Sequence, residues 1–140
     1  MVNAKFKAFD EARFQKDWEI QVYSAVKLCK AVLPAMSKAK FGRVLFIQTS
    51  YTIGCPPKNT AAYVMNKSAI GGLVKSLAVE YARFGITVNC VAPSMMETHF
   101  LKDTPDLIVQ AAAADNPMGR NATPEDVAPA MAFLLSEEAR

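Results

Sequence analysis

The sequence has few of the residues that metal centres and disulfide scaffolds require. Histidine occurs once, at His99, without a ligand partner at a useful spacing, and the three cysteines, Cys29, Cys55 and Cys90, lie far apart in apolar surroundings. An odd number of separated cysteines fits neither a disulfide framework nor a CxxC metal site. We therefore expect no bound metal and three buried thiols in a reducing cytoplasm.

The sequence also lacks runs of like charge and long hydrophobic segments. Its 16 Lys and Arg and 13 Asp and Glu residues are scattered, giving a net charge of +3, so nothing predicts nucleic acid or an anionic membrane as a partner. No stretch approaches the roughly 18 apolar residues of a membrane span, and the N-terminus has no leader-like apolar region. With 140 residues, 51% of them hydrophobic, we expect one soluble, cytoplasmic globular domain.

Apolar residues at steps of three and four predict a long helix over about residues 12–38. Pro34 lies near its end, where it would kink the helix or close its last turn. The apolar stripe consists of Phe14, Trp18, Val22, Ala25, Cys29, Val32 and Met36.

A second long helix is predicted over about residues 61–84. Asn59 or Thr60 can cap its start, and Gly85 suits the left-handed position that follows a helix. Each interior glycine costs a helix about 1 kcal/mol relative to alanine, so Gly71 and Gly72 indicate close packing.

Two short apolar runs, "RVLFI" at 43–47 and "ITVNCVAP" at 86–93, predict strands buried on both faces. With the helix between them they form a right-handed βαβ unit with parallel strands. Further helices are predicted in "PDLIVQAAAAD" and after Thr123. Two such strands cannot bury their own faces or pair their own edges, so residues 1–140 are predicted to be a single partial α/β domain.

Tyr63 and Lys67 lie four residues apart on the second helix and therefore share one face. An ammonium beside a phenol favours the phenolate and lowers the phenol pKa, which suits proton transfer. The alternative is two amphipathic side chains lying along the surface of the helix.

Hydroxyl groups follow both predicted strands, at the sheet edge where open parallel sheets bind ligands. Ser50 comes after the first strand, 13 residues before Tyr63, and Thr98 follows Pro93 after the second. Each also has a plain explanation, since a loop serine can make a local turn and a threonine can be solvated.

Taken together, these segments resemble the classical branch of the short-chain dehydrogenase/reductase family. "GRVLFIQTS" is similar to the strand that ends at the family's catalytic serine, and "PSMMET" to its PGxxxT segment. "AAYVMNKSAIGGLVKSLAVEYARFGITVNCVAPS" resembles its YxxxK helix and the strand that follows. The resemblance runs from about residue 14 to 136.

The resemblance implies part of a Rossmann-like, doubly wound parallel sheet and hydride transfer between NAD or NADP and a small-molecule carbonyl or secondary alcohol. Tyr63 would exchange the proton, Lys67 would lower the Tyr63 pKa, and Ser50 would orient the substrate oxygen. The nicotinamide end of the cofactor would be held by Tyr63, Lys67, Pro93, Ser94 and Thr98.

The sequence departs from the family pattern in three places. Gln21 stands where the family usually has an asparagine that completes a catalytic tetrad, and Ser94 replaces the glycine of PGxxxT. No glycine-rich turn joins a first strand to a helix, and "VNA" at residues 2–4 is at most a remnant of the family's NNAG segment. We therefore expect the pyrophosphate cradle and the family's final strand to lie outside this chain.

Three hypotheses follow. In the first, the chain is the catalytic half of a reductase, inactive alone and active only in the complete domain. In the second, it is a non-catalytic packing or oligomerisation module, because helices 12–38 and 60–84 commonly pair with their mates in another subunit of the family. In the third, it is an unrelated α/β binding domain, and the ordered motifs are coincidence.

Overall fold

The computed structural model describes residues 5–102 and 104–140, so the "VNA" segment at residues 2–4 lies outside the described part of the chain. In the element names, α marks an α-helix, β a strand and η a short turn of 3₁₀-helix, except that η2 is a turn of π-helix. The order is η1 (Phe6–Ala8), α1 (Glu11–Trp18), η2 (Glu19–Tyr23), α2 (Ser24–Ala39), β1 (Gly42–Ile47), η3 (Ser50–Thr52), α3 (Ala61–Tyr81), η4 (Ala82–Phe84), β2 (Ile86–Val91), η5 (His99–Leu101), α4 (Asp106–Asp115) and α5 (Pro124–Leu135).

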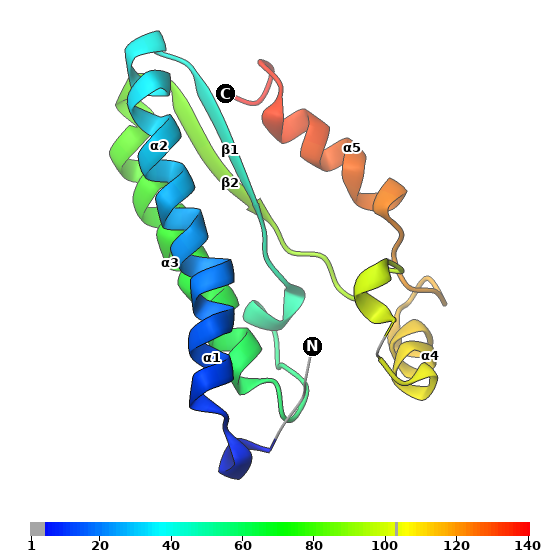
Figure 1. The fold of residues 1–140 in the computed structure, drawn as a ribbon. Coiled ribbons are helices and arrows are strands. Elements are labelled where there is room, and N and C mark those ends of the chain that lie inside the picture. The colour runs from blue at the N-terminus through cyan, green and yellow to red at the C-terminus, as the bar shows by residue number, and fades with distance from the viewer. Residues whose placement is uncertain (1–4, 103) are drawn as a thin grey trace.

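β1 and β2 pair in parallel, with Gly42 opposite Ile86 and Ile47 opposite Val91. The predicted strand–helix–strand unit is confirmed, because α3 connects the two strands. α2 and α3 lie along one face of the strand pair and α5 along the other (Figure 1). The carboxyl ends of both strands therefore point the same way, toward the N-terminal ends of α1 and α3.

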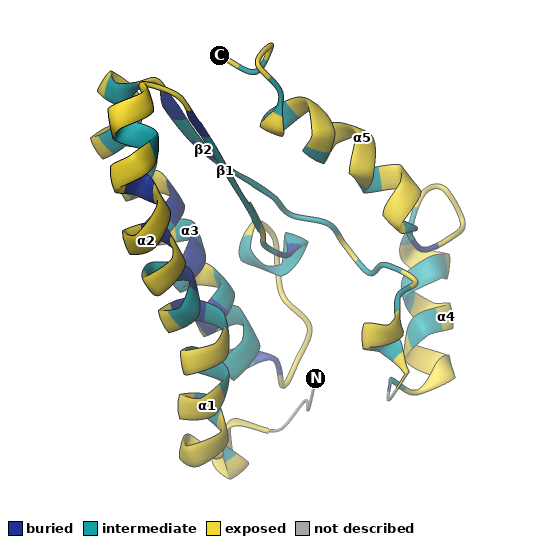
Figure 2. Ribbon diagram, turned by 45° about the horizontal axis from the view of Figure 1, so that its top comes forward, coloured by how far each residue is buried: buried dark blue, intermediate teal, exposed yellow. Residues whose placement is uncertain are grey.

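The hydrophobic core lies between the two long helices and the strand pair, where buried residues gather in Figure 2. α4 and α5 contain no buried residues. No helix within the described ranges is both long and apolar enough to cross a membrane. The buried core residues are Val22, Ala25, Cys29, Leu33, Ile70, Val74, Ile86 and Val88.

The first predicted helix is one continuous rod made of α1, η2 and α2. Pro34 does not close it, since α2 runs on to Ala39. The π-helical turn was not predicted: the Ser24 N–H donates to the Glu19 carbonyl, and the Ser24 hydroxyl donates to the Ile20 carbonyl. Such a turn inserts one residue into the helical repeat and rotates the side chains on either side of it.

The second predicted helix is confirmed as α3 followed by η4, and it ends at Gly85 with φ of +73°. Thr60 is its N-cap residue, but the Thr60 hydroxyl donates to the Pro57 carbonyl at 2.7 Å and does not cap the helix. A Cβ at Gly71 would lie 2.6 Å from the Gln48 side chain, whereas Gly72 has no neighbour within 4 Å. Close packing therefore explains Gly71, and the same expectation for Gly72 was wrong.

The expectation of three buried thiols was also wrong. Cys29 is buried in the core and Cys90 is half-buried, but Cys55 is exposed. Cys55 lies in the loop between η3 and α3, directly before Pro56 and Pro57. Because prolines donate no backbone hydrogen bond, this loop runs over the surface and its cysteine is not packed.

Gly85→Ala should destabilise the fold by about 2 kcal/mol or more, because a left-handed alanine costs about 1–2 kcal/mol and its Cβ would also press on backbone. That Cβ would lie 2.4 Å from the Lys40 carbonyl oxygen. Gly119→Ala is the matched control, since Gly119 has φ of +68° but open space around it, and should cost about 1–2 kcal/mol. Denaturant unfolding measures both, and equal losses would contradict the contact at Lys40.

Candidate active site

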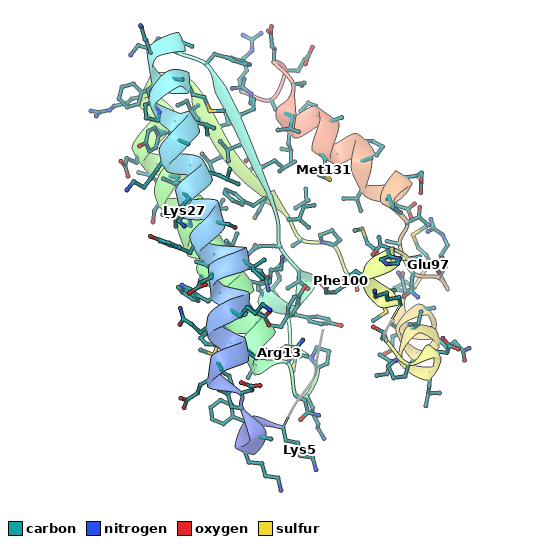
Figure 3. The ribbon with its side chains drawn as sticks, in the orientation of Figure 1. Lys5, Arg13, Lys27, Glu97, Phe100 and Met131 are labelled. Carbon is teal, nitrogen blue, oxygen red and sulfur yellow. The ribbon has the colours of Figure 1, made fainter. Side chains whose placement is uncertain are left out.

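A cavity of about 820 Å³ opens at the carboxyl ends of β1 and β2. One wall comes from α1 and η2, the floor from the ends of the strands and the start of α3, and the opposite wall from the segment after β2. Arg13 and Phe100, labelled in Figure 3, come from opposite walls. The predicted site residues that line it are Gln21, Tyr63, Lys67, Pro93, Ser94 and Thr98.

Lys67 is held against the end of β1. Its Nζ donates to the Ile47 carbonyl at 3.0 Å and lies 5.9 Å from the centroid of the Tyr63 ring. Burial lowers the Lys67 pKa, because removal from water disfavours the ammonium. The shared helix face predicted from the spacing is therefore present, and it faces the cavity rather than the outer surface.

The pKa of Tyr63 differs from the expectation. Burial raises the Tyr63 pKa, the Thr49 side chain lowers it through a hydrogen bond, and nearby Tyr51 raises it. The rings of Tyr51 and Tyr63 meet edge to face, with centroids 6.3 Å apart. Desolvation outweighs every group that favours the phenolate, so the phenol is held protonated at neutral pH.

The hydroxyl that acts on the Tyr63 pKa belongs to Thr49. Thr49 is 5% exposed and lines the cavity. Ser50 is half-buried and is not among the described residues that line the cavity. The Ser50 backbone N–H instead donates to the Pro93 carbonyl at 3.0 Å, which ties the ends of the two strands together.

Gln21 lies in the π-helical turn η2 and lines the cavity. Arg13, Asp17 and Gln21 follow one another at steps of four, so they share the face of the rod that borders the cavity. The neighbouring Ile20 lines the same cavity. The structure thus brings Gln21 to the site and gives its amide access to the same space as Lys67.

The wall after β2 is fixed by contacts from a distant segment. The Glu97 N–H donates to the Ala122 carbonyl at 2.8 Å, and the Ala122 N–H donates to the Met95 carbonyl at 3.1 Å. Asn121 is 3% exposed, and its side-chain amide donates to the Val109 carbonyl of α4 at 3.0 Å. Pro93, Ser94 and Thr98 are therefore carried on an anchored segment, as a binding wall requires.

An ion pair holds that distant segment to α5. Arg120 donates to both carboxylate oxygens of Asp126, at 2.6 and 2.8 Å, and the Thr123 N–H donates to the same carboxylate at 2.8 Å. These bonds keep the pKa of Asp126 well below its usual range. Since the pair is exposed, it is a positional contact more than a large source of stability.

Sequence reasoning missed Thr49 and the aromatic walls. Thr49 follows an apolar strand by two residues, and a β-branched hydroxyl at a strand end was the available signal. Phe9, Phe14 and Phe100 line the cavity, but Phe14 was assigned only to the core stripe. No group of three or more His, Cys, Asp or Glu side chains within the described ranges could hold a metal ion.

Comparison with known proteins identifies the family. A family model described as "Enoyl-(Acyl carrier protein) reductase" matches residues 2–140. The chain belongs to the short-chain dehydrogenase/reductase family. The Rossmann-like α/β fold class predicted from the motifs is confirmed by the solved structures of this family.

Two members of the short-chain dehydrogenase/reductase family show how much sequence they share with this chain. The 3-oxoacyl-(acyl-carrier-protein) reductase FabG of Vibrio cholerae is 37% identical over 130 residues, 89% of this chain and 52% of that protein. Oxidoreductase UcpA of Salmonella typhimurium is 35% identical over 128 residues, 86% of this chain and 49% of that protein. The chain spans about half the length of the curated relatives it matches.

A solved structure from Beutenbergia cavernae, described as an NAD(P)-dependent gluconate 5-dehydrogenase with NADP bound at low occupancy, superimposes with a TM-score of 0.92. It is 29% identical, and the match covers 99% of this chain and 56% of that chain. Relatives in the short-chain dehydrogenase/reductase family are thus NAD(P)-dependent oxidoreductases, and the likeness extends over all elements from α1 to α5.

Thr49→Val should raise the Tyr63 pKa further above its ordinary value. The Thr49 hydrogen bond favours the phenolate, so its loss favours the protonated phenol. In a spectroscopic titration, the tyrosinate signal that Tyr63→Phe removes should then appear at higher pH than in the unchanged chain. Ser50→Ala is the control and should leave the Tyr63 pKa unchanged. A shift of the Tyr63 pKa in Ser50→Ala, without one in Thr49→Val, would contradict the assignment of the hydroxyl to Thr49.

Proposed function

We propose that this chain supplies the acid/base half of an oxidoreductase that transfers hydride between NAD or NADP and a carbonyl or secondary alcohol. The observation that carries the proposal is the convergence of Thr49, Tyr63 and Lys67 in one cavity at the strand ends. Family membership alone would leave the chemistry open, because one fold hosts many functions. The three side chains narrow the proposed chemistry to proton exchange at an oxygen atom.

The cavity suits the nicotinamide end of the cofactor. Its volume of about 820 Å³ lies within the range of about 300–1,000 Å³ for small-molecule sites. Lys67 Nζ donates one hydrogen bond to the Ile47 carbonyl, and its other N–H groups are available to a ribose hydroxyl. The Pro93–Ser94 backbone and the Thr98 hydroxyl would meet the carboxamide. The bound nicotinamide would supply or accept the hydride.

Each residue of the chain has a separate role in this proposal. Tyr63 donates its phenolic proton to the substrate oxygen during reduction and takes it back during oxidation. Its raised pKa keeps the proton in place until a carbonyl oxygen begins to gain charge. Thr49 favours the Tyr63 phenolate through its hydrogen bond to that side chain, while orienting the substrate oxygen is the role that the family resemblance assigned to Ser50. Lys67 favours the phenolate once the proton has left.

Gln21 has the position of the family's usual asparagine and an amide on the cavity wall, so we assign it a hydrogen-bonding role beside Lys67. The cavity combines aromatic side chains with the charged Arg13 and Asp17. We assign Phe14 and Phe100 the exclusion of water from the reacting oxygen. Support for dependence on a second half comes from the length of the relatives, of which the chain covers about half. Pyrophosphate and adenosine contacts would supply much of the cofactor's binding.

Turnover tests the proposal. The chain alone should show little activity, whereas mixing it with the glycine-rich N-terminal half of a family member should give NAD(P)H-dependent reduction of a ketone or a 3-oxoacyl thioester. In that mixture, Tyr63→Phe should lower the rate about 10²–10⁴-fold, the usual contribution of a positioned proton donor. Tyr51→Phe, which keeps the adjacent ring, is the control and should retain most of the rate. An unchanged rate with Tyr63→Phe would refute the assigned role.

A second candidate function is a packing or oligomerisation module built on α1–α2 and α3. The observation in its favour is a set of large apolar side chains exposed on these helices. Large exposed apolar side chains that gather on one surface mark interaction sites in soluble proteins. We propose that a second copy of this chain covers it, with helices 12–38 and 60–84 at the interface. The exposed residues are Ile20, Tyr23, Leu28, Val32, Met65 and Val79.

Charge substitutions on these helices test the interface. Leu28 is 65% and Val79 is 83% exposed in the single chain, so lysine at either position should not disturb its core. Each change should weaken self-association at least about tenfold, because burying such a side chain contributes about 1.5–3 kcal/mol. Leu107→Lys on α4, 77% exposed, is the matched control. Sedimentation that finds only a folded monomer of the unchanged chain at micromolar concentration would exclude this function.

A further inference from the structure

The amide of Gln48 joins three elements directly beneath the candidate site. Its Nε2 donates to the backbone carbonyl of Lys67 in α3 at 2.9 Å, and its Oε1 accepts from the Cys90 thiol of β2 at 3.3 Å. Its own N–H continues the parallel ladder, donating to the Val91 carbonyl at 2.8 Å. Neither end of the amide is left without a partner, as burial requires.

The bonds between Lys67 and the end of β1 are reciprocal. The Lys67 side chain donates to the carbonyl of Ile47, and the next residue, Gln48, donates from its side chain to the carbonyl of Lys67. Two such bonds, one from each partner, tie the start of α3 to the end of β1 in addition to the core packing of Ile70 and Val74.

Gly71 makes room for this amide. It lies one helical turn after Lys67, and a Cβ there would be 2.6 Å from Gln48 Nε2 and 3.5 Å from its Cδ. Such a distance is too short for the amide to stay in place. Gly72, in contrast, is exposed and has no neighbour within 4 Å. The two adjacent glycines therefore differ in contact with Gln48 and in exposure, and only Gly71 makes room for the amide.

We propose that Gln48 is a positioning residue that, with the space left by Gly71, sets where Lys67 and Tyr63 stand relative to Thr49. The inference rests on the proposed function for its catalytic meaning, while the bonds themselves are independent of it. Gln48 acts through Lys67 and does not itself exchange a proton.

The adjacent glycines provide the matched experiment. Gly71→Ala and Gly72→Ala add the same methyl group and the same gain in helix propensity. Only Gly71→Ala displaces the Gln48 amide. The readout is the pKa of the Lys67 ammonium, followed by NMR of nitrogen-labelled lysine in the full 140-residue chain and assigned with Lys67→Met. Burial now lowers that pKa, so an ammonium released toward water should titrate at higher pH.

Gly71→Ala and Gln48→Met should each raise the Lys67 pKa toward its ordinary value, and the double variant should add nothing to either single change. Gly72→Ala should leave the Lys67 pKa unchanged and raise the melting temperature. Equal Lys67 pKa values in Gly71→Ala and Gly72→Ala would overturn the proposal. So would additive shifts of the Lys67 pKa in the variant that combines Gly71→Ala with Gln48→Met. Because alanine favours a helix, Gly71→Ala remains informative where Gln48→Met unfolds.

This experiment separates the two proposals. The Lys67 titration needs no turnover, so it can succeed when Tyr63→Phe leaves the rate unchanged and the proposed function fails. Conversely, Tyr63→Phe can abolish turnover while Gln48→Met leaves the Lys67 pKa unchanged. The catalytic role of Tyr63 then stands and the positioning role of Gln48 is refuted.

Discussion

The parallel register of β1 and β2 decides where every group of the candidate site lies. Ile47 stands opposite Val91, so both strands end at the same level and the residues that follow them share one edge. The crossover helix α3 must then start at that edge to return along the strands, which carries Tyr63 and Lys67 to it. An antiparallel pair would have placed the Thr49 and Pro93 segments at opposite ends of the sheet.

Burial at this edge sets the charges. Lys67 and Tyr63 both lose water, and the loss pushes their pKa values in opposite directions, down for the ammonium and up for the phenol. Both shifts favour the neutral form. The site therefore holds a protonated phenol beside an ammonium with a reduced preference for its charge, and the Thr49 side chain favours the phenolate against this effect of burial.

The periodic parts of this fold follow from the sequence. An apolar stripe predicted the first helical rod, and capping residues with Gly85 predicted the second. Continuous apolarity predicted both strands, and the helix between them predicted their parallel pairing. Gly85 was placed correctly in the left-handed turn before β2. These features depend on patterns that repeat over many residues, so a single unusual residue does not obscure them.

The site was only partly predictable, because its details depend on single residues and three-dimensional contacts. The spacing predicted that Tyr63 and Lys67 share a face, but it could not show that burial would raise the Tyr63 pKa. The position after the strand and the family resemblance selected Ser50, whose role stays a prediction, whereas Thr49, which lines the cavity, was not singled out. The π-helical turn that contains Gln21 leaves no periodic signal, since one inserted residue barely changes an apolar stripe.

The acid/base geometry and the cofactor's affinity depend on different parts of a complete enzyme. Thr49, Lys67 and Tyr63 are fixed by contacts among β1, β2 and α3, and all of these elements belong to the described chain. Affinity for a dinucleotide comes largely from its phosphates and adenosine, which must repay the loss of translational and rotational freedom. In the proposed function, the geometry forms within a chain about half the length of its relatives, whereas tight binding of the dinucleotide would draw on contacts from the other half. The two properties should be separable by experiment, which is why a titration of Lys67 and a turnover assay test different statements about the same site.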